Sequence, residues 1–173
     1  FIGFLNPLLL PEEAMPDFSH EIEIASHLAR KAGEVIMNIY QNDFAFMYKG
    51  IHDPVTKADQ QANTLIVDEL HAHFPQDSIV AEESPLPSKS STTGRVWYID
   101  PLDGTKEFIA RNGEFSIMIG LTIDAHTKLG VVYWPTRDHL YAGLTDQTAW
   151  MEHNGVRQKL SALASKSPTN LSL

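Results

Sequence analysis

Two carboxylates stand three residues apart at the end of a predicted strand, in the segment WYIDPLDGTKEF at positions 97–108. Asp100 and Asp103 follow its apolar residues, and Pro101 and Gly104 shape a turn around them. This arrangement would hold both acids at the end of the strand. The alternative is a simple turn in which each Asp accepts hydrogen bonds from the local backbone, which is a common use of Asp.

Further acids stand at the ends of two other predicted elements. Glu82 and Glu83 directly follow the apolar stretch 79–81, and Asp59 lies in the first turn of a predicted helix. If these ends are neighbours, like charges about 4 Å apart repel by roughly 4 kcal/mol at an effective dielectric of about 20, so the cluster takes up protons or binds a cation. Such oxygens suit Mg2+, and two such ions can polarise a phosphate and generate a hydroxide. The alternatives are a solvated strand end for the two Glu residues and a helix cap, formed with Thr56, for Asp59.

Residues suited to phosphate binding follow the two Asp residues directly. Lys106 and Glu107 can begin a short helical turn after Gly104 and Thr105, so free backbone N–H groups would point toward a phosphate oxygen. The Thr105 hydroxyl would then lie beside bound metal, where a hydroxyl and a carboxylate can orient and deprotonate one water. Two roles are open to Lys106, which are contact with a substrate phosphate and an ordinary solvated position.

The composition narrows the class of protein. The 173 residues are 43% hydrophobic, which is enough to build a core. A formal net charge of -9 and a pI near 5.2 argue against a nucleic-acid polymer as the main partner, because phosphate neutralisation needs clustered Lys and Arg. The absence of cysteine removes disulfides and cysteine nucleophiles and is compatible with a reducing cytoplasm. The eight histidines show no metal-ligand spacing, which argues against zinc.

Periodicity predicts two helices followed by a series of strands. Apolar residues at three- and four-residue spacing indicate helices at 19–40, capped by Ser19, and at 57–74, where TKAD is typical of a capping box. The predicted strands lie at 79–81, 96–99, 115–123, 129–134, 140–144 and 149–152, and Asn154-Gly155 indicates a hairpin. We therefore predict an α+β fold in which two amphipathic helices pack on one face of a largely antiparallel sheet.

Three segments lack a periodic pattern. Residues 84–94 are rich in Ser, Pro and Thr and are predicted to form a mobile loop. The apolar start of the chain is short, is broken by Pro7 and lacks a basic flank, so residues 1–16 are predicted to be a non-native or disordered leader rather than a signal peptide. Residues 161–173 are small and polar and contain no closing element.

Three motifs occur in a fixed order, namely DPVTKAD at 53–59, AEES at 81–84 and DPLDGT at 100–105. Together they resemble the metal-binding motifs of the inositol monophosphatase and fructose-bisphosphatase superfamily. The continuation KEFIARNGEFSIMIGL resembles the 3'(2'),5'-bisphosphate nucleotidase branch better than inositol monophosphatase itself. The resemblance implies the amino-terminal half of the sugar-phosphatase αβαβα fold, with residues 17–160 as its metal-binding domain.

The resemblance also implies roles for individual residues. The groups that would hold two or three Mg2+ ions are Glu82, Asp100, Asp103, the backbone carbonyl of Leu102 and, at a weaker third site, Asp59. The residues that would contact the substrate phosphate are Gly104, Thr105 and Lys106. The catalytic residues would be Glu82, Thr105 and Asp59, the first two of which position the attacking water. Glu83 would support these ligands without binding the metal itself.

The implied activity is a Mg2+-dependent phosphomonoesterase of nucleotide and sulfur metabolism. It would convert 3'-phosphoadenosine 5'-phosphate to AMP and phosphate by attack of a metal-activated water. An inositol monophosphatase-type sugar phosphatase is the nearest alternative. A haloacid dehalogenase-like phosphatase would need a DxDGT motif, and the spacing here is one residue longer.

The resemblance extends to partners and domains. It implies a small phosphorylated substrate, no transmembrane segment and a cytoplasmic location, and it is compatible with a homodimer and with peripheral association with the inner membrane. The second domain of the family carries a further metal-ligand Asp in a WDxAAG-type motif, which does not occur in this sequence. Residues 161–173 are therefore predicted to be the truncated start of a missing domain. An inactive fragment or a cation-binding module is the third interpretation.

Overall fold

The computed structural model describes residues 17–42, 46–50, 53–84 and 93–161. The predicted leader at 1–16, most of the predicted loop at 84–94 and all but the first residue of the segment 161–173 lie outside the described residues.

The elements follow the predicted order of helices and then strands. They are α1 (Ser19–Tyr40), β1 (Phe46–Gly50), β2 (Asp53–Thr56), α2 (Lys57–His73), β3 (Ser78–Ala81), β4 (Arg95–Asp103), α3 (Thr105–Ile109), β5 (Ser116–Ile123), β6 (His126–Trp134), a 3-10 turn (Pro135–Arg137), β7 (His139–Leu144), β8 (Thr148–His153) and β9 (Val156–Leu160). Seven strands form one sheet in the order β3-β4-β5-β6-β7-β8-β9, and β1 pairs with β2 separately. The predicted α+β class is confirmed.

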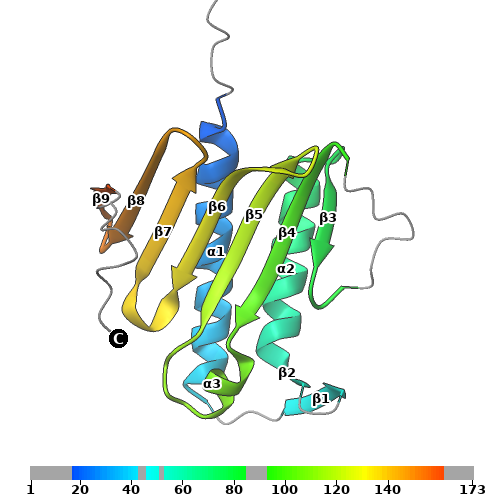
Figure 1. The fold of residues 1–173 in the computed structure, drawn as a ribbon. Coiled ribbons are helices and arrows are strands. Elements are labelled where there is room, and N and C mark those ends of the chain that lie inside the picture. The colour runs from blue at the N-terminus through cyan, green and yellow to red at the C-terminus, as the bar shows by residue number, and fades with distance from the viewer. Residues whose placement is uncertain (1–16, 43–45, 51–52, 85–92, 162–173) are drawn as a thin grey trace, which may run out of the picture.

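Both long helices lie on the same face of the seven-stranded sheet (Figure 1). Their apolar stripes face the strands, with Leu28 and Ile36 of α1 and Ile66 and Leu70 of α2 completely buried. Burial of each such side chain contributes about 1.5–3 kcal/mol relative to exposure. The helices therefore cover one face of the sheet. Among the described residues, no helix covers the other face.

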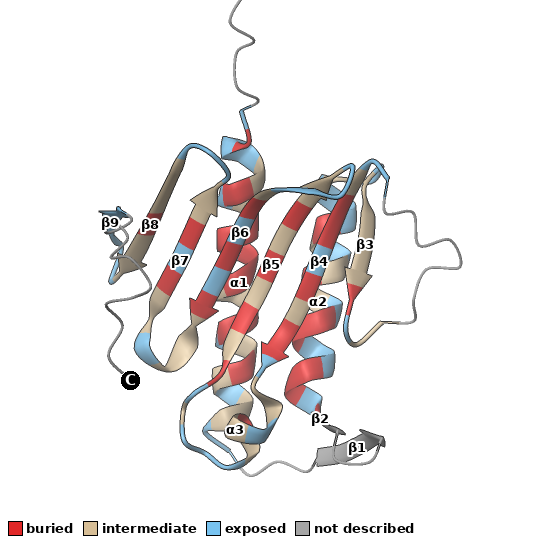
Figure 2. Cartoon of the chain, in the orientation of Figure 1, coloured by how far each residue is buried: buried red, intermediate tan, exposed pale blue. Residues whose placement is uncertain are grey.

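The open face of the sheet carries partly exposed side chains (Figure 2). Residues along each strand alternate between the two faces, so Trp97 and Ile99 of β4 are buried against the helices whereas Tyr98 is 40% exposed. Val132 of β6 and Tyr141 of β7 are exposed to a similar degree, at 37% and 39%. The site residues described below lie at one end of this face.

Two details differ from the predictions. Ser19 does not cap α1, because it is the first helical residue, and the Asp17 carboxylate accepts a hydrogen bond from its backbone N–H at 2.9 Å. The strands β1 and β2 were not predicted. The long sheet is antiparallel except for one pair, since β3 runs parallel to β4.

Candidate active site

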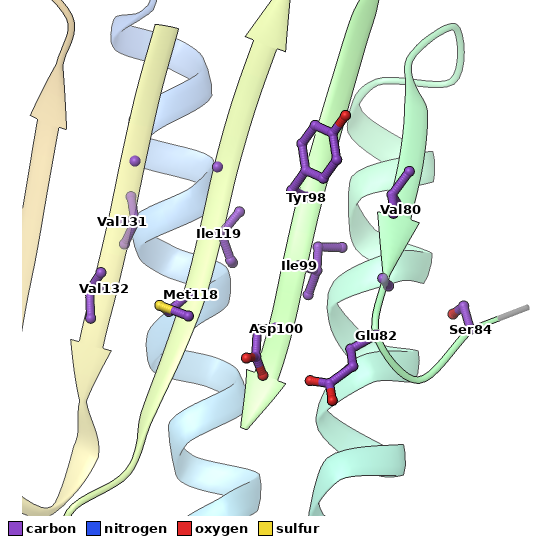
Figure 3. Close-up of a pocket in the computed structure, with 13 residues that line it drawn as sticks. Val80, Glu82, Ser84, Tyr98, Ile99, Asp100, Met118, Ile119, Val131 and Val132 are labelled. Carbon is purple, nitrogen blue, oxygen red and sulfur yellow. The ribbon is translucent and has the colours of Figure 1, made fainter. Parts of the chain in front are cut away.

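The parallel pairing of β3 with β4 brings two of the predicted acids together. Ala81 is in register with Ile99, and the backbone N–H of Glu82 donates to the carbonyl oxygen of Ile99 at 3.1 Å. Parallel strands end at the same edge, so the residues that follow them are neighbours. Figure 3 shows the carboxylates of Glu82 and Asp100 directed toward one another. They line the same hollow on the open face of the sheet.

A bulge in β4 turns the third acid toward the same face. Asp100 pairs with Met118 and Asp103 pairs with Ser116, so three steps along β4 correspond to two steps along β5. Residues two apart on a regular strand point to the same face, and an extra residue within a bulged strand allows residues three apart to do so as well. Asp100 and Asp103 therefore both face the open side, which regular pairing of residues three apart would not allow.

The electrostatics of Asp100 show how close the acids lie. Four effects together raise the pKa of the Asp100 carboxyl from 3.8 to about 7, namely burial, which is the largest, the charge on Glu82, a hydrogen bond with Glu82 and the charge on Asp103; the N–H of Leu102 opposes them. The Leu102 N–H donates to Asp100 Oδ1 at 3.1 Å. Negative charge at this strand end is thus poorly compensated by the protein, which is the condition that favours a bound cation.

The acids do not form a closed metal cage. Among the residues that the structure describes, no three His, Cys, Asp or Glu side chains are arranged around one metal position. Asp103 is exposed and accepts a hydrogen bond from Ser116 Oγ at 3.4 Å. The donor set nevertheless fits a hard divalent ion, since Mg2+ takes one or two carboxylates and keeps several waters.

A buried carboxylate links α2 to the residue after the acids. Asp59 is 2% exposed and completes the predicted capping box with Thr56, whose backbone N–H donates to Asp59 Oδ2 at 2.7 Å. The other oxygen, Oδ1, accepts a hydrogen bond from the Thr105 hydroxyl at 3.0 Å. Thr105 Oγ also lies 3.2 Å from the carbonyl oxygen of Leu102. Because both oxygens of Asp59 are engaged within the protein, its role as a metal ligand stays a prediction.

The short helix α3 is preceded by Gly104, its N-cap residue, which adopts a left-handed conformation with φ of 94°. Beneath α3, the rings of Tyr40, Phe108 and Phe115 pack together with centroids 5.0–5.2 Å apart. Arg111 follows the helix, and its guanidinium donates to the backbone carbonyls of Tyr40 and Asn42. These contacts fasten α3 to the carboxyl end of α1. Of the other predicted site residues, Lys106 is exposed and Glu83 is half-buried.

Replacement of Gly104 by Ala should destabilise the protein by about 1–3 kcal/mol, because the new residue would be strained at positive φ and crowded. The added Cβ would lie 2.9 Å from the Glu114 carbonyl oxygen and 3.3 Å from Phe115 Cα, both of which belong to backbone. Urea unfolding measures the effect. Gly155→Ala is the matched control, because Gly155 has a φ of 73° and no atom of the described residues lies within 4 Å of its added Cβ. Equal losses in the two variants would contradict the crowding at Gly104.

The metal-free protein should become less stable as the pH rises from 4 to 7. The unfolded chain releases the Asp100 proton near its ordinary pKa of 3.8, whereas the folded protein keeps it to about 7, so the folded state holds more protons across this window. The stability that this group contributes is complete below pH 3.8 and is lost as the pH passes 7. After allowance for solvent screening the loss is about 1–2 kcal/mol. Urea unfolding in EDTA measures it, and Asp100→Asn should abolish this part of the slope. Identical slopes in the two proteins would contradict the assignment.

Three residues that contribute to the site were not predicted as part of it. Asn63 and Ser84 connect α2 to the turn that carries Glu82, and Ser116 contacts Asp103. A signal for Asn63 exists in the sequence, because it follows Asp59 by four residues on the face of α2 that is otherwise apolar. Ser116 has no such signal.

The chain belongs to the inositol monophosphatase family, whose family model matches residues 17–172. It is 39% identical over 144 residues to the 3'(2'),5'-bisphosphate nucleotidase CysQ of Escherichia coli K12, covering 82% of this chain and 58% of that protein. It is 38% identical over 138 residues to the Nus factor SuhB of Salmonella typhimurium, covering 79% and 51%. The predicted family resemblance is confirmed.

A solved structure shows the same fold. The Thermotoga maritima IMPase superposes with a TM-score of 0.71 at 31% identity, over 82% of this chain and 54% of that one. This chain therefore spans about half the length of the relatives that it matches. Within the part of the chain that the structure describes, no helix is long and apolar enough to cross a membrane.

Proposed function

We propose that this chain forms the metal-binding part of a Mg2+-dependent phosphomonoesterase. The observation that carries the proposal is the pair Glu82 and Asp100, whose mutual hydrogen bond and raised Asp100 pKa mark a close group of acids on the open face of the sheet. Beside it, in the turn that follows β4, Thr105 is held by a buried carboxylate. Membership of the inositol monophosphatase family supports the same conclusion.

The proposed ligands of Mg2+ are Glu82, Asp100, Asp103 and the backbone carbonyl of Leu102. When bound, Mg2+ polarises the phosphate and lowers the pKa of a water. Asp59 is proposed to serve a third ion, and Gly104, Thr105 and Lys106 to contact the phosphate. Glu83 is proposed to support these ligands without binding the metal itself.

The protein groups provide orientation and proton transfer. Thr105 donates its hydroxyl proton to Asp59 Oδ1, which leaves the lone pairs of Thr105 Oγ available to accept a hydrogen bond from a water. We propose that Glu82 accepts a proton from the same water, so that the water oxygen attacks phosphorus while the ester P–O bond breaks. The departing alkoxide takes up a proton from solvent water and leaves as the alcohol. In this scheme Asp59 orients Thr105.

The proposed substrate is a 3'(2'),5'-bisphosphate nucleotide, namely 3'-phosphoadenosine 5'-phosphate, with AMP and phosphate as products. The 39% identity to a bisphosphate nucleotidase supports this choice. An inositol phosphate is the second candidate, which the likeness to an IMPase favours. A cytoplasmic location and a role in sulfur and nucleotide metabolism belong to the same proposal. Because the chain spans about half of its relatives, an inactive fragment or a cation-binding module is the non-catalytic alternative.

Phosphate release from the two substrates tests the proposal. The purified protein should release phosphate from 3'-phosphoadenosine 5'-phosphate faster than from inositol 1-phosphate, only with Mg2+ present, and EDTA should stop both reactions. Preference for the inositol ester would favour the second candidate. Absence of release from both substrates, together with absence of Mg2+ binding, would refute the phosphatase proposal. Mg2+ binding without release would favour the cation-binding module.

A further inference from the structure

Asn63 is a buried amide with an unpaired end. It lies in α2, is 6% exposed, and its Nδ2 donates to Ser84 Oγ at 2.9 Å. Its Oδ1 has no hydrogen-bond partner among the described residues. In either orientation of the amide, one polar end pairs with Ser84 and the other is left unpaired. Because a buried unpaired polar atom is unfavourable, stability alone does not account for an Asn at this place.

The position of Asn63 relates it to the site. Asn63 follows Asp59 by four residues, so the two side chains lie on one face of α2. Asp59 contacts Thr105 after β4, and Asn63 contacts Ser84 after β3. One helix face therefore holds both chain segments that carry the candidate site residues.

The contact of Asn63 restrains the short turn that carries Glu82. The N–H of Glu82 donates to β4, and the N–H of Ser84 donates back to Ala81 at 3.1 Å, so these two bonds attach the start of the turn to the sheet. The strand before the turn, β3, has four residues and lies at the sheet edge. The Asn63–Ser84 bond attaches the other end of the turn to α2.

We propose that Asn63 is a positioning residue that sets the geometry of the Glu82–Asp100 pair for a divalent cation by holding Ser84. The proposal rests on the proposed function, since it concerns the metal site of the phosphatase. Residues that orient metal ligands typically change metal affinity by about 10- to 100-fold when they are removed. Asn63 acts through the backbone of the turn and contacts no reacting group.

The first test measures Mn2+ affinity from the electron paramagnetic resonance signal of free Mn2+. Asn63→Ala and Ser84→Ala should each bind Mn2+ about 10-fold more weakly, and the double variant should be no weaker than either, because both remove one contact. Thr64→Ala is the matched control and should bind like the wild type, since its exposed hydroxyl donates to the Gln60 carbonyl within α2. The melting temperature of Asn63→Ala should not fall, whereas loss of a purely structural residue lowers it.

The second test needs no metal. Amide hydrogen exchange at Glu82 and Ser84 should be faster in both Asn63→Ala and Ser84→Ala than in the wild type, and unchanged in Thr64→Ala. If Asn63→Ala fails to fold, Ser84→Ala carries both tests, because Ser84 lies half-buried in a turn. Wild-type exchange at these amides, or wild-type Mn2+ affinity in Ser84→Ala, would overturn the inference.

Failure of the proposed function gives a different result. In that case the wild type and Asp100→Asn would show the same weak Mn2+ binding, which overturns the metal site and the positioning role together. Strong wild-type binding with unaltered affinity in Asn63→Ala and Ser84→Ala overturns only the role of Asn63.

Discussion

Asp100→Asn should abolish Mg2+-dependent phosphate release while the protein stays folded. The change removes one charge from the acidic strand end but keeps an oxygen that can accept the Leu102 N–H. Metal-centred charge stabilisation supplies several kcal/mol, and about 1.4 kcal/mol corresponds to a factor of ten, so kcat should fall by about 10³-fold or more. Phosphate release at saturating substrate measures kcat, and circular dichroism verifies the fold.

Asp146→Asn is the control for this experiment. Asp146 is an exposed acid in the turn between β7 and β8, so its replacement removes the same charge from a surface position. Its kcat should equal that of the wild type. Turnover of Asp100→Asn within a few-fold of the wild type would refute the assignment of Asp100 as a metal ligand.

Thr105→Ala should lower kcat by about 10²-fold or more, because a positioned group that takes part in proton transfer typically contributes 10²–10⁴. Mn2+ affinity should change little, since the hydroxyl is bonded to Asp59 and is not among the proposed ligands. Steady-state kinetics and Mn2+ titration separate these two quantities.

Thr105→Ser should restore most of the activity, because it keeps the hydroxyl that bonds Asp59. Thr145→Ala removes an exposed hydroxyl that bonds the Thr127 carbonyl, and it should leave kcat unchanged. A Thr105→Ala protein with wild-type kcat would show that the hydroxyl does not orient the water.

The sequence predicted the elements that rest on periodicity and local chemistry. The helix α1 has its predicted ends, α2 ends one residue early, and Thr56 and Asp59 form the predicted capping box. The hairpin at Asn154 joins β8 to β9 as its turn residues indicate. The pair β1 and β2 was missed because Gly50, Asp53 and Pro54 are residues that strands disfavour.

The geometry of the site could be predicted only in part. The motifs singled out Glu82 and Asp100, but an alternation of apolar residues does not encode the direction in which a strand pairs. The parallel register of β3, which brings Glu82 beside Asp100, therefore came from the structure alone. The same holds for the bulge before Asp103, because register depends on contacts with β5 that the sequence of β4 does not contain.

The double bonding of Asp59 has a consequence for how this protein tolerates sequence change. The Asp59 carboxylate caps the first turn of α2 together with Thr56 and also accepts a hydrogen bond from the Thr105 hydroxyl. One side chain therefore positions both the start of the helix and the proposed water-orienting group. Asn keeps an oxygen for only one of these partners, and Glu, which suits the capping position, would carry its carboxylate one methylene farther from the helix backbone and so at a different distance from Thr105. Variation at position 59 is therefore limited by two independent requirements, the helix cap and the bond to Thr105. The exposed positions of the same helix are subject to neither of them.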